Sequence, residues 1–222
     1  MQAFVVAKSG GAALERVEQP TPADGECLLK VLIAGVCNTD LEILKGYMGF
    51  SGVVGHEFVA TVLSGPQHLC GQRVVGDINL CCRKVTCATC ARADDRARNH
   101  CPSRSVLGIL NKAGAYAEFL TLPAACLHPV PDCVSTENAA FAEPLAAACR
   151  IVEQKLVAPG DKVAVVGDGK LGLLIIEVLA RYAAEHDSPA PLLVGRHPER
   201  AALLPPAPGP VLASDTRPEK ET

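Results

Sequence analysis

The sequence predicts an α/β chain in which a β-rich part is followed by part of a nucleotide-binding fold. Two observations support this prediction. Short segments rich in Val, Ile and Leu, bounded by Gly, Pro and Asp, recur up to about residue 131. A strand, a glycine-rich turn and an apolar helix follow between residues 159 and 185. We therefore expect domains at 1–134 and 135–204, and a disordered, proline-rich tail at 205–222.

Four segments of the first part read as strands: 27–36, 57–65, 71–80 and 114–123. Each is apolar, rich in branched residues and closed by turn-forming residues. Closely spaced strands of this kind are typical of a barrel or a sandwich.

The composition changes at Ser135, where the chain becomes alanine-rich and helical. Ser135 or Thr136 can cap the start of a helix. Pro144 is costly inside a helix but suits a first helical position. We therefore predict a short helix, a break at Glu143 and a second helix from Pro144 to about Lys155. The break would leave the Glu143 side chain free to point into a cleft.

Composition narrows the classes of partner. The 222 residues are 49% hydrophobic, with a net charge of −3 and a pI of about 6.1, so we expect a sizeable core and no nucleic-acid partner. No apolar run reaches membrane-spanning length, and the first residues do not resemble a secretory signal. We expect a cytoplasmic protein without membrane contact, although an organelle stays open.

The cysteines point to metal rather than to disulfides. There are 11, and five of them crowd into 21 residues. Crowding without a secretory signal is typical of metal binding in a reducing compartment. The five are Cys81, Cys82, Cys87, Cys90 and Cys101.

A second candidate metal site lies in "GVCNTDLEILKGYMGFSGVVGHE", residues 35–57. Cys37 and His56 offer a thiolate and an imidazole, which are zinc ligands. The alternative is a buried cysteine and a surface histidine without a metal.

The glycine turn has the pattern G-x-G-x-x-G, formed by Gly167, Gly169 and Gly172, with Lys170 and Leu171 inside it. It follows an apolar strand and opens an apolar helix, which is the context of a dinucleotide site. The glycines permit the tight turn, the close approach of a pyrophosphate and helix–strand packing, and the helix N-terminus attracts phosphates.

The end of the next strand bears on the choice of cofactor. An acid there would hold the ribose 2′-OH of NAD, but position 195 is Gly and Arg196 follows. An arginine can pair with a 2′-phosphate, which favours NADP. The alternative is that Arg196 is simply a solvated charge, so NAD stays open.

"GVCNTD", "GHE", "AEPLAAA" and "VVGDGKLG" occur in the order seen in the zinc-dependent medium-chain dehydrogenases. The chain resembles this family, which includes alcohol, sorbitol, glucose and threonine dehydrogenases, up to about residue 204. The resemblance implies a GroES-like β-barrel domain followed by an incomplete Rossmann-type nucleotide-binding half. It also implies zinc, NADP or NAD, a small alcohol, polyol or sugar as substrate, and relatives that are often homo-oligomers.

The resemblance assigns roles to particular residues. Cys37, His56 and Glu143 would ligate a catalytic zinc, with Glu57 beside it as an alternative ligand. Thr39 would relay the proton of the substrate hydroxyl, and Asp40 would support the site from behind.

The cysteine cluster corresponds to the structural zinc lobe of the family, which has four cysteines separated by two, two and seven residues. Here four residues separate Cys82 from Cys87, and ten separate Cys90 from Cys101. These four thiolates can still close a tetrahedral site. Whether Cys81 or Cys82 serves stays open, and the alternative is a loop whose insertions have abolished the site.

Members of the family are longer than this chain. The alternative to an active dehydrogenase is therefore a truncated form that binds zinc without turnover.

Overall fold

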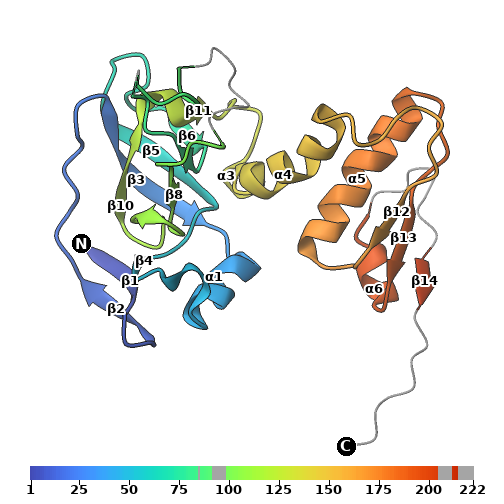
Figure 1. Cartoon of the computed structure of the whole chain (residues 1–222), viewed down its shortest axis with the longest axis horizontal. Helices are drawn as coiled ribbons and strands as arrows, with labels where there is room; N and C mark the ends of the chain where they lie inside the picture. The colour runs from blue at the N-terminus through green and yellow to red at the C-terminus, as the bar shows by residue number, and fades with distance from the viewer. Residues whose placement is uncertain (85, 92–98, 205–211, 215–222) are drawn as a thin grey trace, which may run out of the picture. The chain divides into compact units, whose positions relative to one another are not determined.

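The structure of the chain is a computed structural model that describes residues 1–84, 86–91, 99–204 and 212–214. The chain divides into two compact units, Met1–Glu143 and Pro144–Thr222. The first unit is rich in strands and the second alternates strands and helices (Figure 1). The predicted α/β class is confirmed.

The first unit is built around a five-stranded antiparallel sheet with the order β10-β3-β5-β6-β11. Two three-stranded sheets, β2-β1-β4 and β7-β8-β9, complete its described strands. The strands are β1 (Gln2–Val6), β2 (Ala12–Arg16), β3 (Glu26–Ala34), β4 (Gly52–Val53), β5 (Phe58–Ser64), β6 (Arg73–Gly76), β7 (Asn79–Leu80), β8 (Ser105–Leu107), β9 (Asn111–Lys112), β10 (Phe119–Pro123) and β11 (Leu127–Pro129).

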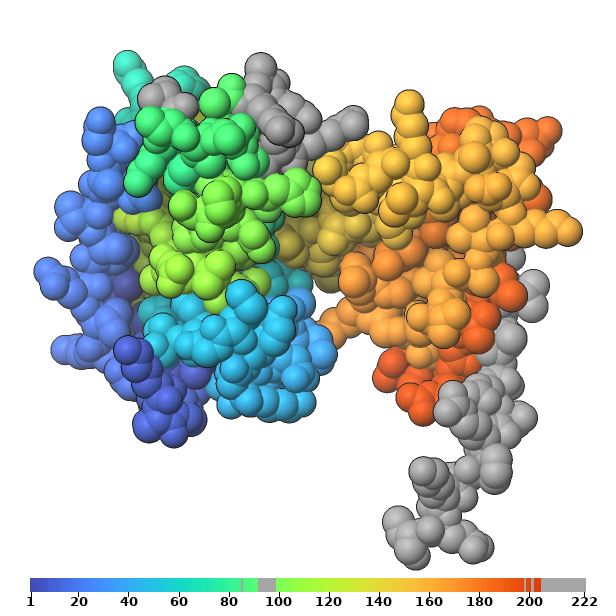
Figure 2. Space-filling model, in the orientation of Figure 1, coloured from blue at the N-terminus to red at the C-terminus, as the bar shows by residue number. Residues whose placement is uncertain are grey.

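The short helices of this unit are α1 (Asn38–Leu44), η1 (Tyr47–Gly49), η2 (Ala124–Cys126) and α3 (Thr136–Ala139). Helices α1 and η1 lie at the surface (Figure 2), where Leu41, Tyr47 and Met48 are exposed.

Two of the four predicted strands differ in extent from the structure. The segment 71–80 forms two strands, because Asp77 Oδ1 accepts a hydrogen bond from the Asn79 N–H at 2.9 Å and turns the chain. The segment 114–123 becomes regular only at Phe119. Its first residues bond instead to the segment around β4, where the Tyr116 N–H donates to the Val54 carbonyl at 2.9 Å.

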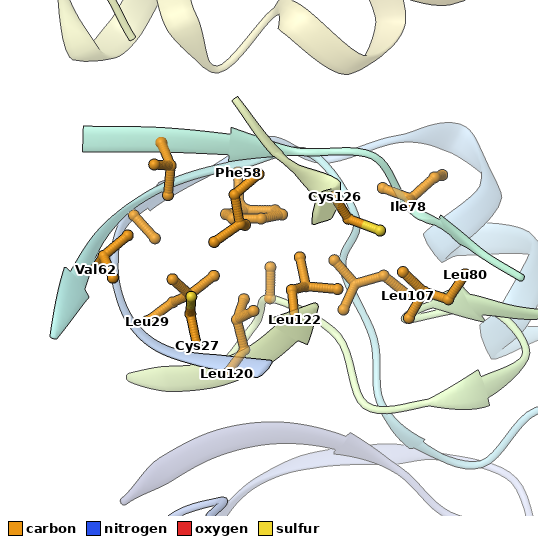
Figure 3. Close-up of a cluster of buried hydrophobic side chains, with 14 of the residues drawn as sticks. Cys27, Leu29, Phe58, Val62, Ile78, Leu80, Leu107, Leu120, Leu122 and Cys126 are labelled. Carbon is orange, nitrogen blue, oxygen red and sulfur yellow. The ribbon is translucent and has the colours of Figure 1, made fainter. Parts of the chain in front are cut away.

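The core of the first unit lies between the strands of its sheets. Figure 3 shows Leu29, Phe58, Leu107 and Leu122 among the apolar side chains of this cluster. Leu29, Leu107 and Leu122 are fully buried. Each fully buried side chain of this size stabilises the fold by about 1.5–3 kcal/mol, so this core supplies the rigid base for the loops that follow β3 and precede β5.

The helical segment that follows departs from the prediction at Pro144. Ser135 caps α3, since its Oγ accepts from the Asn138 N–H at 3.1 Å. The next helix, α4 (Ala142–Glu153), starts before Pro144, so the predicted break at Glu143 is wrong. A proline is tolerated in the first helical turn because the N–H that it lacks has no acceptor within the helix there. Glu143 is therefore a first-turn residue of α4.

The second unit contains a parallel sheet with the order β12-β13-β14. Its strands are β12 (Ala164–Val166), β13 (Leu192–Gly195) and β14 (Leu212–Ser214), and its further helices are α5 (Lys170–Glu185) and α6 (Pro198–Ala201). Ile176 and Leu179 of α5 pack with Val165 and Leu193 of the sheet.

Strand β14 lies within the tail that we expected to be disordered. It extends the sheet by parallel pairing with β13. The rest of the expected tail, 205–211 and 215–222, lies outside the described residues. Among the described helices, none has the length and apolar character needed to cross a membrane.

Candidate functional site

Cys37 lies at the start of α1, shortly after strand β3. The Asp40 side chain reaches back over the first turn, and its Oδ2 accepts a hydrogen bond from the Cys37 N–H at 2.9 Å. This satisfies one of the N–H groups that a helix start leaves without an acceptor. Thr39 Oγ1 lies 3.5 Å from Cys37 Sγ. A single helical turn thus fixes a thiol, a hydroxyl and a carboxylate side by side.

His56 is buried next to this turn, with 3% of its surface exposed. Its Nδ1 lies 3.4 Å from Asp40 Oδ1, which is long for a hydrogen bond. Burial alone lowers the pKa of His56, but Asp40 and Cys37 outweigh it and raise the pKa to about 9. Because Nδ1 faces a carboxylate, Nε2 is the nitrogen left for a metal, which is the usual arrangement of a metal-binding histidine.

Glu57 brings a carboxylate to the same place. The ligand atoms of Cys37, His56 and Glu57 all lie within 4.8 Å of one another. The carboxylate occupies the space that a Cβ on Gly35 would fill. The glycine of "AGVC" is therefore required by the position of the Glu57 side chain.

Glu143 stands outside this set of three mutually close ligand atoms. Burial raises the pKa of its carboxyl group, the charge of His56 opposes this rise, and the carboxylate of Glu57 adds to it. These electrostatic contributions show that Glu143 lies in the environment of His56 and Glu57. Its assignment as a zinc ligand stays a prediction.

Tyr116 belongs to the site but carries no signal in the sequence motifs. Its hydroxyl oxygen lies 2.8 Å from Asp40 Oδ2 and 2.8 Å from the Gly35 carbonyl oxygen. Its ring lies where a Cβ on Gly55 would be, and Phe4 packs edge-on against it. Tyr116 therefore holds the carboxylate that contacts both Cys37 and His56. The sequence predicted only a strand over 114–123, the segment that contains Tyr116.

The cysteine cluster also converges. The sulfur atoms of Cys82, Cys87, Cys90 and Cys101 all lie within 4.8 Å of one another, and Cys81 is not among them. The Cys82–Cys90 separation is 3.7 Å and the Cys87–Cys101 separation is 3.9 Å. A tetrahedron with Zn–S bonds of about 2.3 Å has edges of about 3.8 Å. The four sulfurs therefore fit a zinc ion, despite the longer spacing between the cysteines.

The cysteines of this cluster differ in acidity. Backbone N–H groups of Cys90 and Thr89 lower the pKa of Cys87 to about 6. Burial and the neighbouring sulfurs raise the pKa of Cys90 to about 12. Four converging thiols are suited to a cation, because a metal replaces the protons of all four.

In the second unit, the glycine turn has the predicted form. Gly167 adopts φ = 113°, and Gly169 caps α5, whose first residues are Lys170 and Leu171. A Cβ on Gly172 would overlap the Gly167 carbonyl. The turn is tight, and the start of α5 that follows it is the part of a helix where phosphates bind in dinucleotide sites.

The end of β13 differs from what its sequence suggests. A Cβ on Gly195 would overlap the Asp168 side chain, so a carboxylate does lie at this strand end. Asp168 is 6% exposed, and it accepts hydrogen bonds from the backbone N–H and the ring of His197. Arg200 Nη1 lies 3.9 Å from its Oδ1, whereas Arg196 is exposed.

Comparison with known proteins agrees with both units. The "Alcohol dehydrogenase GroES-like domain" family matches residues 23–132. The curated "L-threonine 3-dehydrogenase" of Xanthomonas campestris (strain B100) is 31% identical over 192 residues, covering 80% of this chain and 53% of that protein.

Solved structures extend the match across the chain. The structure described as "short chain alcohol dehydrogenase (rspB)" of E. coli CFT073, complexed with NADH, has a TM-score of 0.82 at 27% identity. The match covers 97% of this chain and 63% of that chain. A putative zinc-binding dehydrogenase of Sinorhizobium meliloti 1021, bound to NADP, has a TM-score of 0.81 at 26% identity, covering 96% and 61%.

The chain belongs to the medium-chain alcohol dehydrogenase family. The predicted fold, a GroES-like domain followed by part of a Rossmann-type nucleotide-binding domain, is confirmed. The chain spans about half the length of the curated relatives it matches.

Proposed function

We propose that this chain carries the zinc site and the dinucleotide turn of an oxidoreductase that transfers hydride between an alcohol and NADP or NAD. The convergence of Cys37, His56 and Glu57 supports this most directly. A thiolate, an imidazole and a carboxylate form a ligand set that zinc accepts. The Asp40 carboxylate behind His56 is the partner that such a histidine needs.

Cys37 and His56 would hold the catalytic zinc, with Glu57 or Glu143 as the third protein ligand. The zinc would supply a Lewis acid that polarises the substrate oxygen and lowers its pKa. Thr39, next to Cys37 Sγ, would relay the hydroxyl proton to solvent, accepting it on its oxygen as it gives up its own, while the nicotinamide would take the hydride from the carbon. Asp40 would keep the His56 ring in its binding orientation.

Gly167, Gly169 and Gly172 would hold the pyrophosphate at the start of α5, with Lys170 and Leu171 in the first turn of that helix. Arg196 would lie near the adenosine ribose. Cys82, Cys87, Cys90 and Cys101 would hold a second, structural zinc, and the distances between their sulfurs support this.

The substrate class that we propose is a secondary alcohol, a polyol or a sugar. The names of two curated relatives, L-galactonate-5-dehydrogenase and L-threonine 3-dehydrogenase, support this class.

The activity is tested with the zinc-loaded chain, NADP or NAD, and a panel of polyols, sugars and secondary alcohols, by the absorbance of the reduced cofactor. We expect turnover that Cys37→Ala abolishes and that Cys70→Ala, an exposed cysteine outside both clusters, preserves. A chain that keeps full zinc but never reduces either cofactor would favour the non-catalytic alternative.

A further inference from the structure

Asp168 places a carboxylate at the end of β13, where the sequence shows only Gly195 and Arg196. We propose that Asp168 sets the cofactor selectivity of this chain by opposing the 2′-phosphate of NADP. This inference rests on the proposed dinucleotide site and adds to it a residue outside the usual pattern, in which the selecting acid stands on the strand itself.

The position of the carboxylate is fixed by packing. The Cβ, Cγ and Oδ2 atoms of Asp168 each lie 2.5 Å from the point where a Cβ on Gly195 would be. Real side-chain atoms do not approach this closely, so Asp168 and a side chain at position 195 exclude each other. Gly195 is therefore explained by Asp168, and its lack of a carboxylate is not evidence for NADP.

The carboxylate is also fixed by hydrogen bonds. His197 donates its backbone N–H to Asp168 Oδ2, and its Nδ1 lies 3.1 Å from both carboxylate oxygens. These bonds, above all that from the His197 ring, lower the pKa of Asp168 to about 2. The group is thus a permanent negative charge that cannot swing away when an anion approaches.

The same carboxylate reduces the attraction that the basic side chains of this region can offer to a phosphate. Arg200 lies 3.9 Å from Asp168 Oδ1, so part of its charge is already compensated. Arg196 is exposed at the strand end. Removing the Asp168 charge would remove a repulsion and release Arg200 toward a phosphate, and both changes favour NADP.

The first test is Asp168→Asn, which keeps an acceptor for the His197 N–H and removes only the charge. Binding of NADPH and NADH is followed by the fluorescence of the nucleotides, and the chain has no tryptophan to interfere. We expect the ratio of the two dissociation constants to shift roughly fivefold or more toward NADPH, as expected for one unit charge a few ångströms away in a wet site. The matched control is Asp161→Asn, which also removes an Asp that bonds to a backbone N–H and should leave the ratio unchanged.

The second test moves the carboxylate to the usual position with the pair Asp168→Gly and Gly195→Asp. Glycine is needed at 168, because the Asp168 Cβ itself lies within 2.5 Å of the new Cβ. We expect the exchanged chain to regain the selectivity of the parent, while Gly195→Asp alone should fold poorly.

An unchanged ratio in Asp168→Asn, or a shift toward NADH, overturns the proposal and leaves Asp168 as an anchor for the loop after β13. A parent chain that binds neither nucleotide overturns the proposed dinucleotide site itself.

Discussion

The two groups of candidate metal ligands are assembled in different ways. Cys82, Cys87, Cys90 and Cys101 come from one stretch of 20 residues and offer four sulfurs at tetrahedral distances. Cys37, His56 and Glu57 come from a helix start and a loop before β5, and they offer three different ligand types. A closed set of four thiolates is typical of structural zinc, and an open set of three is typical of catalytic zinc.

The supporting contacts differ as well. The described residues from Cys82 to Cys101 lie in no helix or strand, so we expect the shape of the cysteine cluster to depend on a bound metal. The other group, Cys37, His56 and Glu57, is called the mixed group here. Side chains outside it support it, because Asp40 contacts Cys37 and His56 and is itself held by Tyr116. We therefore expect metal loss to unfold the first region and to leave the second largely in place.

Cys101→Ala should have the largest effect on stability. Cys101 is fully buried, and without it the cluster cannot complete four sulfur ligands. A metal at 1,000 times its dissociation constant stabilises by about 4 kcal/mol, which corresponds to a loss of roughly 8–16 °C in Tm for a chain of this size. Calorimetry measures the shift, and Cys133→Ala, an exposed cysteine outside the cluster, is the control. Equal Tm values for both variants would show that the cluster carries no structural metal.

Exchanging Glu57 or Glu143 for glutamine should decide which carboxylate completes the mixed group. The structure brings Glu57 close to Cys37 and His56, and the family pattern favours Glu143. Loss of a zinc ligand should lower the affinity for zinc by more than the roughly 10–100-fold expected for a residue that only hydrogen-bonds to a ligand. Competition with a chelator measures the affinity of each variant. The glutamine variant with the greater loss of zinc affinity identifies the ligand. Zinc affinity equal to that of the parent chain in both variants would show that neither carboxylate is a ligand.

Tyr116→Phe should have a smaller effect, confined to the mixed group. The variant keeps the ring against Gly55 and Phe4 but removes the hydroxyl that contacts Asp40. Outer partners of metal ligands typically change affinity by about 10–100-fold, and we expect roughly tenfold for zinc at the mixed group. The visible spectrum of the cobalt-substituted chain should change in the same variant. Tyr47→Phe, at an exposed tyrosine, is the control, and identical affinities in both variants would refute a positioning role.

The sequence predicted the parts of this molecule that depend on local pattern. The strand cores at β3, β5 and β13, the glycine turn and the cap at Ser135 all follow from neighbouring residues. The start of α4 was misplaced because a proline signals both the end of one helix and the first turn of another.

The contacts that the sequence did not predict join distant segments. Tyr116 meets Asp40 across 76 residues, and Asp168 meets His197 across 29. Neither contact has a fixed spacing or an unusual composition, because each depends on how strands pair in space. The glycines opposite them, Gly55 and Gly195, were the only signals, and a glycine does not reveal which side chain it makes room for.

Zinc counting on the purified chain shows whether the mixed group of Cys37, His56 and a carboxylate holds a metal of its own. Elemental analysis after removal of loosely bound metal should find two zinc ions per chain, one for each ligand group. Cys37→Ala and His56→Ala should each retain one, and Cys101→Ala should retain the other. A parent chain with a single zinc that survives in both Cys37→Ala and His56→Ala would show that the mixed group holds no metal.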